Sequence, residues 1–421
     1  TIQSSLYQGL PFKLYLEAEP SLRWQLYYED NIYGGEKDIQ SDFSNRYTPE
    51  FMINIKSDKF ALSGEMQLLI TEYMHEREWN TVNQDYTLTA TYNFNPRVIV
   101  ALTGVYSVNT DANRYFKTDT DDIGSVALEG SYYVNKYKTK TRAGGLTYKY
   151  LLSPRSSVDM LVNYSNFDTG GSENSDFYIG GLGYNYNLTT KTTLNLNYDF
   201  NYLHFAYSGG DTQFIQDLIS GGDYTVNFGS DFKSKIHSLS GGLSHEFSND
   251  SQIAVSLRWS HNVQEIKTET TDNATGEKIS EKRKPSGDSI DWKITYEKAF
   301  TDTRIKFDID QGTGTNANSD TSFTSRYLTT RVSHYFTRRF SGSLSFRYNI
   351  YHADGGDIGY KINRHILYVS SSFSYVWTRW LNVSVGYTYS KNHNKTTHST
   401  TERNTCYVSL NIHPLRPYVF R

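Results

Sequence analysis

The sequence predicts an all-β protein, a transmembrane antiparallel up-and-down β-barrel of about 18 strands. Apolar and polar residues alternate over stretches of about ten residues, short polar turns alternate with long loops, and no apolar run approaches the ~20 residues of a membrane helix. From 191 to 202, Leu194, Leu196 and Tyr198 alternate with polar residues, which predicts a strand with one apolar face. A soluble β-sandwich would also alternate, but one series of hairpins over 421 residues is too long for it.

The composition agrees with a barrel. Only 37% of the residues are hydrophobic, as expected if every second strand residue faces lipid. The 36 tyrosines and 22 phenylalanines suit aromatic girdles at the two membrane interfaces. A net charge of -3 gives no reason to expect nucleic acid as a partner. Cys406 is the single cysteine, which excludes an intrachain disulfide, a CxxCH haem site and a cysteine metal cluster, so no cofactor or metal is expected.

Short connections rich in Pro, Asn, Asp, Ser and Thr mark the turns between strands, and several of them are basic. Short turns are periplasmic in outer-membrane barrels, and long loops, here 206–233 and 265–289, are extracellular. The second of these loops is charged and is expected to form a solvated outer ribbon. The short turns are Ser57–Lys59, Asn95–Arg97, Ser153–Arg155, Thr189–Lys191, Ser248–Asp250, Thr301–Thr303, Thr337–Arg339 and Trp377–Trp380.

About eight short turns imply roughly sixteen strands, and one more at each end gives eighteen, an even number as single-chain bacterial barrels require. The region 109–139 is ambiguous, because Ser125–Val134 could form another strand. We assign it to a β-ribbon in a long outer loop, since a single extra strand would break the parity. The expected strands are 13–33, 43–56, 60–75, 84–94, 98–108, 139–152, 156–166, 177–188, 192–205, 235–247, 251–265, 290–300, 303–311, 322–336, 340–352, 362–376, 381–391 and 403–413.

The chain, residues 1–421, is expected to form one barrel domain in the outer membrane of a Gram-negative bacterium. Thr1 is not an initiator methionine and no basic-plus-apolar leader is present, which indicates that a signal peptide has been removed. Residues 1–12 are expected to be a periplasmic N-terminal segment. Because Pro414 and Pro417 cannot donate to a ladder, residues 414–421 are expected to be a periplasmic tail.

An eighteen-stranded barrel leaves an aqueous channel, and its polar strand faces should line that channel. The charges fall on this face because a charge facing lipid at mid-bilayer would cost about 2–4 kcal/mol. They form either a hydrated wall of paired charges or a mixed-charge constriction for polar solutes. The predicted pore-lining residues are Glu17, Glu19, Arg23, Glu65, Asp159, Asn195, Asn197, Asp199, Asn201, Arg258, Asp291, Lys293, Arg304, Lys306, Asp308, Arg331 and Arg347.

A second candidate pore element lies in the first long loop. Phe214, Ile215, Leu218 and Ile219 fit one side of a short helix between glycine pairs. The segment could fold inward and narrow the pore, or it could be a capped surface turn.

An enzyme is not expected. Six histidines fall mainly on the lipid-facing parity near strand ends, and their spacing gives no Ser-His-Asp arrangement and no pair of catalytic carboxylates. Cys406 shares the apolar parity of Val408 and is expected to be an inert lipid-facing thiol. The histidines are His204, His237, His245, His261, His334 and His365.

The first third of the chain resembles the outer-membrane β-barrel family encoded beside exopolysaccharide and exosortase (PEP-CTERM) loci. The resemblance covers about residues 14–110 and becomes generic afterwards. It implies polysaccharide secretion across the outer membrane and carries over no catalytic residues. Arg421 departs from the terminal aromatic with which such barrels often end. The residues that carry the resemblance are Pro20–Leu22, Tyr28–Tyr33, Ser41–Phe43, Thr48–Pro49, and later Leu151–Arg155 and Leu188–Leu194.

Four functions remain open from the sequence. The leading one is a channel that exports a polysaccharide or similar polar polymer together with periplasmic proteins. The others are a general diffusion porin, which would be a homo-oligomer, a sheath around a multihaem cytochrome partner, and a structural or adhesive surface barrel. In each case the outside of the barrel would contact outer-membrane lipid and lipopolysaccharide.

Overall fold

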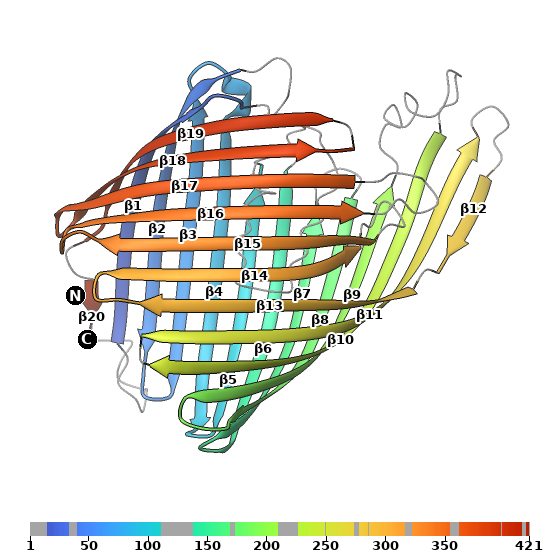
Figure 1. Cartoon of the computed structure of the whole chain (residues 1–421), viewed down its shortest axis with the longest axis horizontal. Coiled ribbons are helices and arrows are strands. Elements are labelled where there is room, and N and C mark those ends of the chain that lie inside the picture. Colours follow the sequence, from blue (N-terminus) through green and yellow to red (C-terminus); the bar gives the residue numbers. More distant parts are fainter. Residues whose placement is uncertain are drawn as a thin grey trace, which may run out of the picture.

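The computed structural model describes residues 15–32, 40–110, 138–168, 173–208, 226–248, 250–272, 278–284, 286–315, 322–353, 362–396, 398–414 and 418–420. It shows a closed antiparallel barrel of eighteen strands, which confirms the predicted fold class and strand number (Figure 1). The first residues of β1 and the short strand β20 lie at the end of the barrel that carries the short turns (Figure 1). Within the described residues, no helix is long and apolar enough to cross a membrane.

Each barrel strand pairs with its neighbours in sequence, and β1 pairs with β19 to close the sheet. Two short strands are additions: β12 pairs with β11, and β20 pairs with β1. The strands are β1 (Tyr15–Glu29), β2 (Asp42–Lys56), β3 (Phe60–Tyr73), β4 (Thr81–Asn95), β5 (Val98–Asn109), β6 (Thr139–Ser153), β7 (Ser156–Asp168), β8 (Glu173–Asn187), β9 (Thr192–Ser208), β10 (Val226–Ser248), β11 (Ser251–Asp272), β12 (Lys278–Arg283), β13 (Ser286–Ala299), β14 (Thr303–Thr315), β15 (Ser322–Tyr335), β16 (Phe340–Ala353), β17 (Ile362–Thr378), β18 (Leu381–Asn394), β19 (Ser399–Ile412) and β20 (Tyr418–Phe420).

The extracellular ends of several strands are longer than the sequence predicts. β10 begins at Val226 and β11 ends at Asp272, so much of the loops predicted at 206–233 and 265–289 is strand. The alternation disappears there because those ends have no lipid to face, while backbone pairing continues. The pairing of β11 with β12 forms the outer ribbon expected in the second loop. On this ribbon Lys282 Nζ lies 2.5 Å from Glu265 Oε1, and that hydrogen bond lowers the pKa of Glu265.

The C-terminal segment is not a free tail. β19 ends at Ile412, close to the predicted end, but Tyr418–Phe420 return to the sheet as β20 and pair with Leu16–Ala18 of β1. β1 therefore pairs with β19 from Leu22 to Glu29 and with β20 below that point. Because β20 covers an edge that would otherwise be open, it protects β1 from unwanted strand pairing.

Three predicted segments lie outside the described residues. They are the N-terminal segment 1–12, the ambiguous strand Ser125–Val134, and the possible pore loop with Phe214, Ile215, Leu218 and Ile219.

The apolar side chains lie mainly on the outside of the barrel. Among the described residues, the buried hydrophobic side chains are Ile32, Val108, Phe205 and Phe232. Large exposed ones, such as Leu88, Leu196 and Leu257, follow the alternation along the strands. A fold with this distribution needs an apolar solvent around it, because exposed apolar area on this scale is unusual in soluble proteins.

The seam between the first and last barrel strands is fixed by side chains at its extracellular end. Glu29 on β1 is only 5% exposed and accepts from Arg46 Nη2 at 3.1 Å and from Arg403 Nη2 at 2.9 Å. The Asp30 carboxylate accepts from the backbone N–H of Asn404 at 2.6 Å, and Asn31 donates to the carbonyl of Glu402. These contacts join β1 to residues near the end of the chain.

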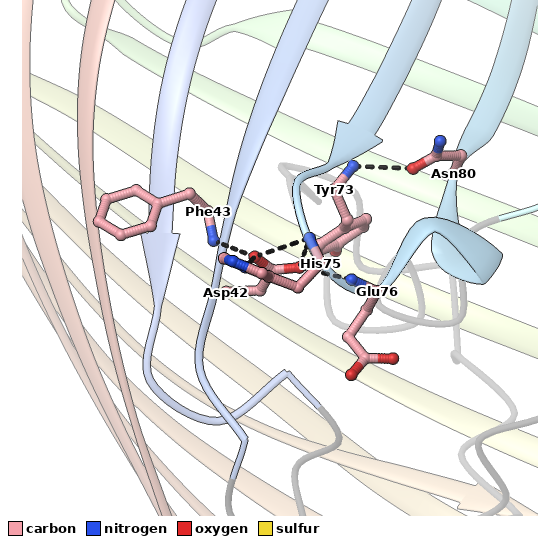
Figure 2. Close-up of polar contacts among 6 residues, drawn as sticks. All are labelled: Asp42, Phe43, Tyr73, His75, Glu76 and Asn80. Atoms are coloured by element: carbon pink, nitrogen blue, oxygen red, sulfur yellow. Dashed lines mark hydrogen bonds and ion pairs between the residues drawn. The ribbon is translucent and has the colours of Figure 1, made fainter.

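A second cluster holds the loop between β3 and β4, which contains the 3-10 helix η1 (Arg77–Trp79). Figure 2 shows the Asp42 carboxylate at its centre. It accepts backbone hydrogen bonds from Phe43 at 2.7 Å, His75 at 3.1 Å and Glu76 at 2.9 Å, and it lies 2.9 Å from His75 Nδ1. Asn80 Oδ1 accepts from the N–H of Tyr73 at 2.8 Å across the loop (Figure 2).

Replacing Asp42 by alanine is expected to loosen this loop. The side chain is nearly buried, at 1% residue exposure, so its removal leaves backbone donors of the loop without their acceptor. Hydrogen exchange should accelerate at the amides of His75 and Glu76. Asn80→Ala removes one acceptor and should have a smaller effect. Equal exchange in D42A and the unchanged protein would show that the loop is held by other contacts.

Candidate pore lining

The register of the sheet defines the two faces of the wall. On β9, Leu196 and Tyr198 are exposed and lie beside Leu239 on β10, which is also exposed. Asn195, Asn197, Asp199 and Asn201 alternate with them and therefore point to the lumen. β9 therefore has its apolar face on the outside of the barrel and its polar face on the lumen.

The same parity holds around the barrel. The structure places all seventeen predicted pore-lining residues on the face opposite to the exposed apolar side chains. Thus Glu65 on β3 lies between the outward Gly64 and Met66, and Arg331 on β15 lies opposite Ser345 on β16. Their role in passage of a solute stays a prediction.

Charges of opposite sign lie next to one another across the middle of the wall. Arg258 Nη2 on β11 is 3.9 Å from Asp199 Oδ2 on β9, and Arg258 lies directly opposite Asp291 on β13. Asp291 Oδ1 also accepts from the backbone N–H of Thr313 at 2.8 Å. Lys293 lies opposite Asp310 on β14. This part of the wall therefore carries a strong local field but nearly balanced charge.

More ion pairs lie nearer the short turns. Lys56 Nζ is 3.2 Å from Glu17 Oε2, and Arg304 Nε is 2.9 Å from Glu297 Oε1. Asp159 is 3.8 Å from Lys149 and accepts from the amide of Asn185. Such pairs contribute about 0–1 kcal/mol each in a wet wall, so they orient side chains more than they stabilise the fold.

Hydroxyl groups form rows between these charges. On β16–β18 the Oγ atoms of Ser343 and Ser372 are 2.8 Å apart, and Ser384 donates to Ser374 at 3.1 Å. Thr388 donates to Ser370 at 3.2 Å in the same sector. A hydroxyl can donate and accept, so these rows can exchange their mutual hydrogen bonds for bonds to a polar solute.

The six histidines lie on the outward face of the barrel, as their parity predicts. Each has one side-chain hydrogen-bond partner among the described residues, and five of them also lie against an aromatic ring. His204 is 2.8 Å from Asp231, His261 is 2.8 Å from Asp288, and His237 is 2.8 Å from the Tyr198 hydroxyl. His245 and His334 contact threonine hydroxyls, and His365 contacts the Tyr348 hydroxyl. Cys406 is exposed on the same outward face, opposite Tyr28.

One cluster on the lumen face of the seam was not predicted from the sequence. The Tyr27 ring stacks on Tyr407 with centroids 5.3 Å apart, and the Arg46 guanidinium lies 3.9 Å from the Tyr27 ring centre. Gly386 provides space for the Tyr407 ring, because a Cβ at that position would collide with it. Glu29 pairs with both Arg46 and Arg403, and together these residues form a connected patch on the lumen wall.

Comparisons with known proteins place the chain among outer-membrane barrels. It is similar to the ferric-catecholate import receptor Fiu from E. coli K12, with a TM-score of 0.53 at 8% identity over 94% of this chain and 81% of that one. The copper transporter OprC gives a TM-score of 0.51 at 9% identity over 91% and 62%. The outer membrane protein OpdK from Pseudomonas aeruginosa gives 0.44 at 10% identity over 94% and 99%. No protein-family model and no curated protein matches.

These similarities show the fold alone. The closed sheet of eighteen strands and its apolar exterior place the protein in the outer membrane of a Gram-negative bacterium.

Proposed function

We propose that this barrel exports a polysaccharide or a similar polar polymer, together with periplasmic proteins. The fold is that of an outer-membrane channel, and eighteen strands enclose a lumen too wide to be filled by its own wall. The observation that supports the cargo is the combination of balanced charges, such as Arg258 with Asp199, and hydroxyl rows, such as Ser343 with Ser372.

A sugar polymer suits this wall for a physical reason. It offers many hydroxyls and no formal charge, so it can exchange hydrogen bonds with the wall without meeting a large electrostatic barrier. Transport also requires that each contact be weak enough to break. Hydroxyl pairs near 3 Å, as on β16–β18, are neutral contacts of that kind.

The test is a current recording from the purified barrel in a planar bilayer, with and without neutral oligosaccharide. An exporter of sugars should conduct and should show longer current blocks with oligosaccharide than with polyethylene glycol of the same hydrodynamic size. Equal blocks would favour a general diffusion porin, which shares these wall features. Absence of conductance, or co-purification with a haem protein, would favour the adhesive or sheath functions.

The charge balance of the lumen wall can be shifted towards negative charge by a single substitution. Arg258→Gln removes the cation between Asp199 and Asp291, so negative charge dominates that part of the lumen. The reversal potential across a KCl gradient should move towards the value for a potassium-selective channel. The double variant D199N/R258Q should return it towards the unchanged protein. An unaltered reversal potential in R258Q would place Arg258 outside the conducting path.

A further inference from the structure

Four hairpin turns at the periplasmic end share one sequence pattern. An apolar residue is followed by Ser, Thr or Asn, then by any residue, then by Lys or Arg. The four segments are Phe94–Arg97, Leu152–Arg155, Leu188–Lys191 and Phe336–Arg339.

The four turns also share one geometry. In each, the side-chain oxygen of the Ser, Thr or Asn accepts a hydrogen bond from the backbone N–H of the basic residue two positions later. This local bond is a recurrent way of fixing a turn. The distances are 2.8 Å for Asn95 and Arg97, 3.1 Å for Ser153 and Arg155, 3.1 Å for Thr189 and Lys191, and 3.2 Å for Thr337 and Arg339.

Because the four turns share this bond, the basic residue has the same place in each turn, two residues after the Asn, Ser or Thr. The apolar residue before the turn is exposed on the outside, as Phe94 is at 57%. A side chain in that position enters the hydrocarbon edge, so the cation three residues later lies at the level of lipid headgroups. Successive hairpins are two strands apart, or about 10 Å, which gives an arc of regularly spaced cations along β4–β9.

Two other hairpins show that the turn does not itself need a cation. Phe247 and Phe300 are exposed before the β10–β11 and β13–β14 turns, and Ser248 Oγ accepts from the N–H of Asp250 at 3.3 Å. Asp250 occupies the position of the basic residue in the first turn, and Thr303, preceded by Asp302, occupies it in the second. The apolar residue is kept in both turns although the position of the cation is acidic in one and uncharged in the other, so turn formation does not require the cation.

The β17–β18 turn is a variant of the pattern, with Trp380 at the position that the basic residue has in the other four turns. Trp377 is 64% exposed before the β17–β18 turn, Arg379 lies within the turn, and Trp380 is also exposed. Tryptophan is favoured at membrane–water interfaces, where one part of its ring is apolar and its N–H meets polar groups. The position of this turn at a lipid interface agrees with that of the other four.

We propose that the basic residues of these turns, Arg97, Arg155, Lys191 and Arg339, bind the phosphates of anionic phospholipids in the periplasmic leaflet. A lipid surface fits better than an acidic protein, because each cation follows an apolar side chain that only a bilayer would cover. Lys191 already donates to the carbonyl of Phe247 on the neighbouring hairpin at 3.5 Å, so it retains two further donors for a phosphate. This surface is independent of what crosses the lumen.

The test measures which lipids the purified full-length barrel retains. The protein is extracted from vesicles of phosphatidylcholine and phosphatidylglycerol, and the bound lipids are counted by native mass spectrometry. The unchanged protein should be enriched in phosphatidylglycerol. Each substitution should lower that preference about fivefold, since each cation near an anionic surface contributes on this scale. The variant R97Q/R155Q/K191Q/R339Q should show no enrichment.

Arg331→Gln is the matched control, because it removes the same charge from the same hairpin as Arg339→Gln but from the lumen side. It should retain phosphatidylglycerol as the unchanged protein does. Folding of every variant is checked by the heat-dependent mobility of the barrel on a denaturing gel. Enrichment that persists in the fourfold variant overturns the proposal. An unchanged protein without a preference for phosphatidylglycerol overturns it as well, and capture of an acidic periplasmic protein by the turns would then assign them to a protein partner.

Discussion

Glu29→Ala is expected to destabilise the folded barrel by about 3–5 kcal/mol, the cost of breaking a buried ion pair by removing one partner. The carboxylate is almost inaccessible to solvent and lies between Arg46 and Arg403. Loss of the Glu29 carboxylate leaves the guanidinium groups of Arg46 and Arg403 without the anion that pairs with both, so the two positive charges repel each other. The damage is located at the closing seam, where β1 pairs with β19 only from Leu22 to Glu29.

Urea unfolding of the barrel in lipid vesicles measures this effect. Glu17→Gln is the control, because Glu17, also on the lumen face of β1, pairs with Lys56 of β2. Unlike Glu29, this pair is exposed: the Lys56 side chain is 57% exposed and the Glu17 side chain 32%. That pair should contribute at most about 1 kcal/mol. Similar unfolding midpoints for E29A and E17Q would show that the seam does not depend on the Glu29 cluster.

The barrel itself could be predicted from the sequence because lipid imposes a period of two on every strand. Asn195 and Leu196 can be assigned to opposite faces without knowing any neighbour. Where lipid is absent, the constraint disappears. The first part of β10, including Asp231 and Lys233, has no apolar alternation and was predicted as loop, although it pairs with β9.

Specific contacts could not be predicted, because they depend on register and closure. Asp199 and Arg258 were both assigned to the lumen, but their proximity requires the pairing of β10 with β9 and β11. Glu29 and Arg403 are 374 positions apart and meet only when the sheet closes. A hint existed, since Glu29 and Asp42 lie in the segments that carry the family resemblance, but nothing in their spacing showed what they contact.

The distribution of charge also distinguishes the two ends of the barrel. At the extracellular end, Glu29 and Asp42 are nearly buried and hold backbone segments in place. At the periplasmic end, Arg97 and Arg155 are exposed on turns that would form without them. Charges of the first kind should affect folding when replaced, whereas charges of the second kind should affect only what the barrel binds.

Leu88→Arg tests the assignment of faces most directly, and it should cost about 2–4 kcal/mol of folding free energy in a bilayer. Leu88 lies near the middle of β4, is 53% exposed, and has the small residues Gly64 and Gly104 opposite it on β3 and β5. An arginine there would face hydrocarbon at a depth from which its head group reaches water only with difficulty.

Thr89→Arg is the matched variant, one residue away on the same strand. Thr89 faces the lumen, where it lies opposite Ser63 and Thr103, so a new charge there meets water and uncharged neighbours. Unfolding by urea in vesicles should therefore show a large loss of stability for L88R and little for T89R. In a planar bilayer, T89R should shift the reversal potential towards anion selectivity. If T89R were the more destabilised of the two, the face now assigned to the lumen would be the buried or lipid-facing one, and a channel through this barrel would have to be abandoned.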